Sequence, residues 1–204
     1  MPHYRAASPR GSLSLVASAS ERLDSRVAAF GLKAGAVLFA TAATATAAQV
    51  SVTVPWTAVP FTLQPIAVLL AGAVLGARLG MLSQVTYLAL GITGASMFAL
   101  SPVLAPGLAR LLGPTGGFLM AYPLAAFAAG RLADRGWTRT CAGAAGAMLA
   151  GLAVIYAGGA AWLTLLAGPS ALGPLAAFVA VDLVKVAVAA AVLPAAVRAL
   201  GPSR

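Results

Sequence analysis

GPLAAFVAVDLVKVAVAAAVLPAAVRAL, the stretch from Gly173 to Leu200, places an acid and a base inside a long apolar run. Asp182 and Lys185 are three residues apart, so on a helix both side chains lie on one face, about one turn apart. Charges placed in a membrane usually pair with each other or face a polar cavity. The pair is therefore either a lock between two helices, or a ligand site in which Lys185 meets an anion and Asp182 accepts a hydrogen bond.

The composition of the whole chain is that of a helical membrane protein. Of its 204 residues, 61% are apolar and 8% are charged, and the mean hydropathy is +0.95. A soluble domain carries about 25% charged residues. The apolar runs are far longer than the strands of roughly ten residues in a membrane β-barrel. Because the chain also has 22 glycines, and small residues let helices approach closely, we expect a compact all-α bundle.

The net charge of +9 follows membrane topology and does not require a nucleic-acid partner. Eleven of the 13 Lys and Arg residues fall on one side of the predicted spans, Arg110 falls on the other, and Lys185 lies within a span. This asymmetry predicts that both termini are cytoplasmic. The single cysteine, Cys141, excludes an internal disulfide and a multi-cysteine metal site.

Six apolar runs predict one domain of six transmembrane helices over residues 26–204, preceded by a flexible cytoplasmic tail over residues 1–25. Within the tail, a short interfacial helix over residues 13–23 is the alternative. We expect Arg78 and Gly80 to mark the turn between the second and third helices. The predicted helices cover approximately residues 26–50, 65–77, 79–92, 117–132, 141–166 and 174–200.

The second and third predicted helices are short. At about 13–14 residues each they reach roughly 20 Å, against a hydrocarbon layer of about 30 Å. They are therefore two short or tilted spans, with a re-entrant hairpin as the competing interpretation.

The first predicted helix carries a stripe of small residues, Ala36, Ala40, Thr44 and Ala48, at four-residue intervals. Such a stripe is suited to tight packing against another helix. It packs internally in a protein that works alone, and it is equally a candidate docking face in a subunit of a larger complex.

Two segments are predicted to lie on the outer side: residues 51–65, which contain three prolines, and the Gly- and Pro-rich residues 94–117. Long loops without their own secondary structure are uncommon unless they are functional, so the second is a candidate lid. The last helix descends from this side, which places Lys185 about 16 Å below its start. The charged pair therefore lies beneath the loops, within reach from outside.

The chain lacks the motifs of an enzyme. It has no G-x-x-x-x-G-K-[ST] phosphate loop. The acids other than Asp182 lie on the predicted cytoplasmic side, and the only histidine, His3, lies in the N-terminal tail. We therefore expect no catalytic residues, no metal and no cofactor.

Residues 59–76, VPFTLQPIAVLLAGAVLG, resemble the VPFTLQ…LAVLLAGALLG block of the BioY family. These proteins are the biotin-specific capture subunits of energy-coupling-factor transporters. Three further blocks follow in the family's order and spacing: YLALG at 87–91, GPTGGF at 113–118 and VDLVK at 181–185. The resemblance covers about residues 50–186.

The resemblance implies a six-helix protein of the bacterial plasma membrane that binds biotin near the outer face, beneath the loops joining helices 1–2 and 3–4. A separate transmembrane coupling subunit and two ATP-binding subunits would power uptake. Asp182 and Lys185 match the family's D-x-x-K positions and are the leading ligand-binding candidates. Which group of biotin meets Lys185 stays open. Further candidates, chosen for their position beneath the loops and each with a structural role as the alternative, are Thr62, Gln64, Tyr87, Gly91 and Tyr122.

Three hypotheses follow. The first is a biotin-capture subunit surrounded by membrane lipid, with Ala36, Ala40 and Ala48 as the candidate docking face for the coupling subunit. The second is a capture subunit for another small vitamin. The third is a structural membrane protein in which the Asp182–Lys185 pair only locks helices. Whether the chain forms a homo-oligomer is also open.

Overall fold

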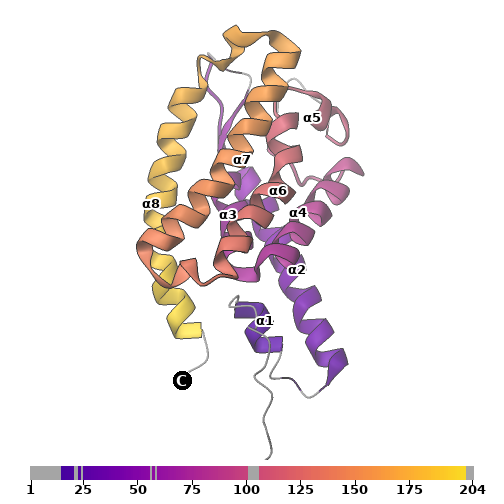
Figure 1. Ribbon diagram of the computed structural model, residues 1–204. Coiled ribbons are helices and arrows are strands. Elements are labelled where there is room, and N and C mark those ends of the chain that lie inside the picture. Colours follow the sequence, from indigo (N-terminus) through magenta and orange to yellow (C-terminus); the bar gives the residue numbers. More distant parts are fainter. Residues whose placement is uncertain are drawn as a thin grey trace, which may run out of the picture.

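The computed structural model describes residues 15–20, 23, 25–55, 57, 59–100 and 106–200, and these form one helical bundle (Figure 1). Within this part, six helices of 12 to 27 residues confirm the predicted all-α, six-helix class. The long helices are α2 (Arg26–Gln49), α3 (Gln64–Leu75), α4 (Ala77–Ile92), α6 (Gly116–Ala133), α7 (Cys141–Ala167) and α8 (Leu175–Leu200). The short elements are α1 (Leu15–Ser20), α5 (Ala109–Leu112) and the 3-10 helices η1 (Trp137–Arg139) and η2 (Pro169–Leu172).

In the part of the chain that the structure describes, three segments are long and apolar enough to cross a membrane: Arg26–Gln49, Cys141–Ala167 and Pro169–Ala199. They include α2, α7 and α8, while α3 is a shorter apolar helix. The short α1 lies within the segment for which an interfacial helix is the alternative prediction. Residues 1–14, 21, 22 and 24 of the predicted tail lie outside the described residues.

The turn between α3 and α4 differs from the prediction. It lies at Gly76, whose φ of 84° is in the left-handed region that favours glycine, and not at Arg78 and Gly80. A Cβ on Gly80 would lie 2.7 Å from the Cα of Gly72, so the two helices touch backbone to backbone beside the turn. The Asp134 carboxylate accepts a hydrogen bond from the first amide of α4, on Ala77, at 3.1 Å.

The small-residue stripe of α2 faces the interior of the bundle. Ala40, Thr44 and Ala48 are buried and Ala36 is half-buried. The Gln84 amide of α4 donates to the Thr44 hydroxyl at 3.2 Å. Most of the stripe therefore packs against the chain's own helices, and its role as a docking face for another subunit stays a prediction.

The two ends of the bundle differ in charge. The start of α2, the α3–α4 turn, the α6–α7 turn and the end of α8 lie at one end (Figure 1). The described basic residues at these positions are Arg26, Arg78, Arg131, Arg135, Arg139 and Arg198. The segments between α2 and α3 and between α4 and α6 lie toward the other end, as predicted. That the basic end is cytoplasmic stays a prediction.

The centre of the bundle is packed through small residues of α6. Ala125, Ala126 and Ala129 are fully buried, and a Cβ on Gly72 of α3 would overlap the backbone of Ala126. The α3, α4 and α7 helices all pack against α6. The interior of the bundle is therefore tightly packed between the start of α3 and the basic end.

Candidate functional site

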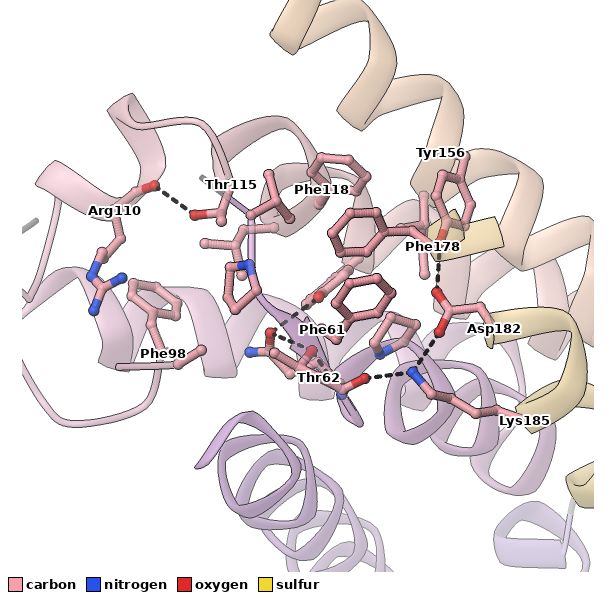
Figure 2. A pocket seen from close by; sticks show the side chains of 18 residues that line it. Phe61, Thr62, Phe98, Arg110, Thr115, Phe118, Tyr156, Phe178, Asp182 and Lys185 are labelled. Carbon is pink, nitrogen blue, oxygen red and sulfur yellow. Dashed lines mark hydrogen bonds and ion pairs between the residues drawn. The ribbon is translucent and has the colours of Figure 1, made fainter. Parts of the chain in front are cut away.

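A pocket lies between this packed centre and the end of the bundle opposite the basic one (Figure 2). It is bordered by the start of α3, by the segment around α5, and by the halves of α6, α7 and α8 that are farther from the basic end. Its cavity volume is about 50 Å³. Two short strands, β1 (Ser51–Val52) and β2 (Phe61–Thr62), pair antiparallel. This pairing folds the segment between α2 and α3 back over the bundle, so that Phe61 and Thr62 line the pocket.

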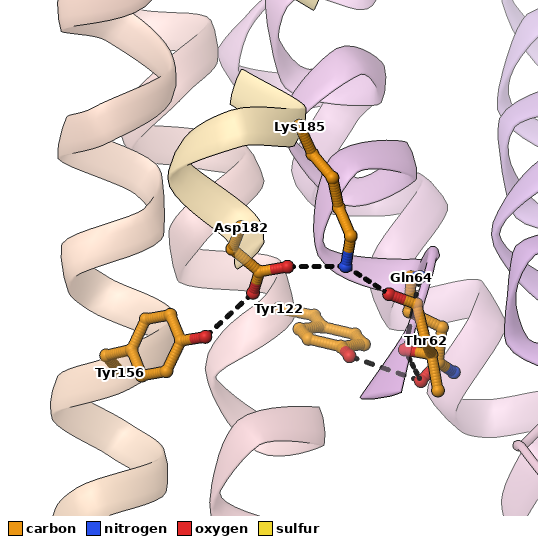
Figure 3. A network of polar contacts seen from close by, with 6 residues as sticks. All are labelled: Thr62, Gln64, Tyr122, Tyr156, Asp182 and Lys185. Carbon is orange, nitrogen blue, oxygen red and sulfur yellow. Dashed lines mark hydrogen bonds and ion pairs between the residues drawn. The ribbon is translucent and has the colours of Figure 1, made fainter. Parts of the chain in front are cut away.

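The Asp182–Lys185 pair forms one wall of the pocket, and Asp182 is only 6% exposed. The Lys185 ammonium donates to Asp182 Oδ1 at 2.6 Å and to the Thr62 carbonyl at 2.7 Å (Figure 3). The Tyr156 hydroxyl of α7 donates to Asp182 Oδ2 at 2.8 Å. An ammonium has three N–H groups and each carboxylate oxygen accepts more than one hydrogen bond. The pair therefore joins α8 to its neighbours and keeps capacity for a ligand.

Gln64 is the centre of a second polar network. Its Oε1 accepts from the hydroxyls of Thr62 and Tyr122, each at 3.3 Å. Its Nε2 donates to the Tyr87 hydroxyl at 2.5 Å, and Tyr87 donates to the Met97 carbonyl at 3.0 Å. The Gln64 amide is thus held in one orientation at the floor of the pocket.

Five of the seven predicted ligand-binding residues line the pocket, and their contact with a ligand stays a prediction. They are Thr62, Gln64, Tyr122, Asp182 and Lys185. The other two lie outside the lining. Tyr87 stands behind Gln64, and Gly91 lies against the Phe98 ring, which a Cβ at position 91 would overlap.

Several aromatic rings also line the pocket, and they are not among the predicted ligand-binding residues. Phe61 and Phe178 stack with their ring centroids 3.9 Å apart and their planes 8° apart. The Phe118 and Tyr156 rings meet edge to face at 6.0 Å. Phe178 precedes Asp182 by one helical turn, which is a signal that sequence reasoning could have used. The other rings reach the pocket only through tertiary packing.

Arg110 of α5 is a second basic group in the lining, and it is not among the predicted ligand-binding residues either. The side chain is 6% exposed, and its Nε has no hydrogen-bond partner among the described residues. Burial lowers the pKa of the guanidinium from its usual value, and the electrostatic interaction with Tyr87 opposes this shift. Arginine nonetheless stays protonated in proteins. The pocket therefore contains a fixed cation apart from Lys185.

The comparisons with known proteins agree with this architecture. A probable biotin transporter BioY of Pyrococcus horikoshii is 42% identical over 151 residues, which cover 72% of this chain and 85% of the relative. The biotin transporter BioY of Rhodobacter capsulatus is 40% identical over 147 residues, covering 64% and 74% of the two chains. A crystal structure of the S-component for biotin from an ECF-type ABC transporter shares the fold, with a TM-score of 0.71 and 24% identity over 79% of this chain and 88% of that one. Residues 24–202 match the family model, and the chain belongs to the BioY family.

Proposed function

We propose that this protein captures biotin at the outer face of a bacterial plasma membrane, as the substrate-binding subunit of a vitamin importer. Membership of the BioY family and the similarity to biotin transporters support this function. The observation that carries it is the pocket that joins the Asp182–Lys185 pair to stacked aromatic walls.

The chemistry of the pocket suits the chemistry of biotin. Biotin has a ureido ring with two N–H donors and a carbonyl acceptor, an apolar thiophane ring, and a chain that ends in a carboxylate. Asp182 accepts from N–H donors, and Lys185 donates to carbonyl or carboxylate oxygens. Phe61, Phe118 and Phe178 supply the apolar surface that small-molecule sites typically present.

Uptake requires an energy source that this chain does not contain. Its sequence has no G-x-x-x-x-G-K-[ST] phosphate loop. We infer a separate transmembrane coupling subunit and two ATP-binding subunits as partners. Ala36, Ala40 and Ala48 of α2 are the candidate docking face for the coupling subunit, and Ala36, which is half-buried, is the least covered of the three.

Isothermal titration of the purified protein with biotin tests the proposal. We expect a dissociation constant in the micromolar range or tighter. Lipoic acid, which has a sulfur ring and a carboxylate chain but no ureido group, is the matched competitor and should bind much more weakly. Absence of biotin binding would refute the proposal. Tighter binding of thiamine or riboflavin than of biotin would instead indicate a capture subunit for another vitamin.

A further inference from the structure

Three arginines surround the turn between α6 and α7, at the basic end of the bundle (Figure 1). Arg131 lies in the last turn of α6, Arg135 follows this helix, and Arg139 ends η1. All three side chains are exposed. The η1 helix packs against α7 and α8, and α7 is long and apolar enough to cross a membrane. This arginine cluster, Arg131, Arg135 and Arg139, therefore lies beside the start of a span.

The arginine cluster has an excess of positive charge. Within the part of the chain that the structure describes, the acid in this turn is Asp134. Its Oδ2 accepts a hydrogen bond from the Ala77 amide at 3.1 Å. This contact brings the α3–α4 turn to the end of α6, and Arg78, next to Ala77, adds a further positive charge there. The other described acid, Asp182, lies in the pocket. Because arginine stays protonated, the turn favours an anionic partner.

Trp137 indicates the depth of the arginine cluster in the membrane. It lies between Arg135 and Arg139 in the sequence, and it is 46% exposed. A Cβ on Gly146 of α7 would lie 3.0 Å from the indole ring, so one part of the ring lies against α7. The next residue, Thr138, is buried and holds η1 on the bundle. Tryptophan is enriched where the hydrocarbon layer meets the lipid headgroups, so the arginines beside Trp137 lie at the depth of the phosphates.

We infer that the α6–α7 turn binds the headgroup of an anionic phospholipid, with Arg135 and Arg139 on its phosphate and Trp137 against its acyl chains. A guanidinium donates two parallel hydrogen bonds to phosphate oxygens. Membrane topology requires only that this end be positive. The indole held between two arginines adds an apolar surface to the charges. Lipid binding at this turn is independent of biotin capture in the pocket at the other end of the bundle.

A phospholipid matches both parts of this surface. Its phosphate pairs with the guanidinium groups, and the acyl chains that begin at the same depth contact the exposed part of the indole. An acidic surface on a soluble protein matches the charges alone, because it offers no apolar layer at the edge of a span. The combination of Trp137 with the arginine cluster therefore favours lipid.

Native mass spectrometry of the purified full chain tests this lipid site. The protein, in a neutral detergent and about 0.15 M ammonium acetate, is titrated with phosphatidylglycerol or with phosphatidylcholine of the same acyl chains. At this ionic strength charges act over about 8 Å, so distant charges contribute little. We expect the wild type to bind the anionic phosphatidylglycerol at least about tenfold more tightly than phosphatidylcholine, which has no net charge.

Variants with matched changes of charge locate the site. Arg135→Gln/Arg139→Gln should weaken phosphatidylglycerol binding roughly 10- to 30-fold and phosphatidylcholine binding much less. Arg135→Lys/Arg139→Lys keeps both charges and should keep most of the affinity. The control is Arg26→Gln/Lys33→Gln, which removes two exposed charges from α2, a helix that packs against α3 and α4. It should change the affinity for phosphatidylglycerol less than about threefold.

Equal affinity of the wild type for the two lipids would overturn the lipid site and leave an acidic protein surface as the partner of the arginine cluster. Equal losses in the two glutamine variants would overturn it as well, because affinity would then follow net charge rather than this turn. All four substituted side chains are exposed, so the glutamine variants should melt within about 2 °C of the wild type. A lower melting temperature in both the glutamine and the lysine variants of Arg135 and Arg139, with parallel loss of both lipids, would identify these arginines as structural and refute the site.

Discussion

Asp182→Asn separates a ligand-binding pair from a pair that only locks helices. The substitution keeps the size of the side chain and removes its charge. In the native structure Oδ1 accepts from Lys185 at 2.6 Å and Oδ2 accepts from Tyr156 at 2.8 Å. An amide offers a single acceptor oxygen in place of two. The variant therefore loses both the counter-charge of Lys185 and one of its acceptors for the ureido ring.

Asp182→Asn should weaken biotin binding and should cost less stability than the loss of a partner from a fully buried ion pair. Loss of one hydrogen bond to a charged group costs about 1.5–3 kcal/mol, which weakens biotin binding roughly 10- to 150-fold. Removing one partner of a fully buried ion pair costs about 3–5 kcal/mol of stability. The actual cost should be smaller, because the Lys185 side chain is 19% exposed and keeps its bond to the Thr62 carbonyl.

Calorimetry with biotin and thermal unfolding in detergent measure the two effects of Asp182→Asn separately. Asp134→Asn is the matched control, because that carboxylate accepts from the Ala77 amide beside the α3–α4 turn, away from the pocket. The control should change stability without changing the dissociation constant. Wild-type affinity in Asp182→Asn, together with a lowered melting temperature, would refute the ligand role and leave the pair as a helix lock.

Two further substitutions probe the walls of the pocket. Phe61→Ala removes the ring that stacks on Phe178 at 3.9 Å, so biotin should both associate and dissociate faster in stopped-flow measurements; an unchanged association rate would contradict a covering role for Phe61. Gly91→Val drives a side chain into the Phe98 ring and should lower the free energy of unfolding by about 1–3 kcal/mol. Gly35→Ala, where a Cβ meets no atom within 4 Å, is its control, and equal melting temperatures in the two variants would count against the packing argument.

The long helices were predictable from the sequence because length, hydropathy and flanking charge agree there. α2 ends at Gln49 and α7 at Ala167, each within one residue of its predicted end. The α3–α4 turn was less predictable, since Gly76, Arg78 and Gly80 are all compatible with a turn. Gly76 takes the positive φ, and Gly80 is instead needed for close packing against α3.

The candidate site was predictable only where charge made it conspicuous. Asp182 and Lys185 stand out because intramembrane charges are rare. Arg110 lies in a Gly- and Pro-rich segment, and no pattern in the sequence indicates that its side chain is buried. Tyr156 contacts Asp182 across 26 positions of sequence, a contact that depends on how α7 packs against α8. The places of Arg110 and Tyr156 in the pocket depend on tertiary packing, which local periodicity does not encode.

Lys185 links the pocket to the segment that covers it. Its ammonium donates to Asp182 and to the Thr62 carbonyl, and Phe61, next to Thr62, stacks on Phe178. The cavity of about 50 Å³ is smaller than the roughly 150 Å³ that admits benzene, so we expect β2 to move away from α8 when a bicyclic ligand enters. Ligand oxygens can then replace the Thr62 carbonyl at Lys185, so that one hydrogen bond is exchanged for another rather than lost. The Asp182–Lys185 pair then has two roles. It holds helices together when the β2 segment is closed, and it binds the ligand when that segment is open.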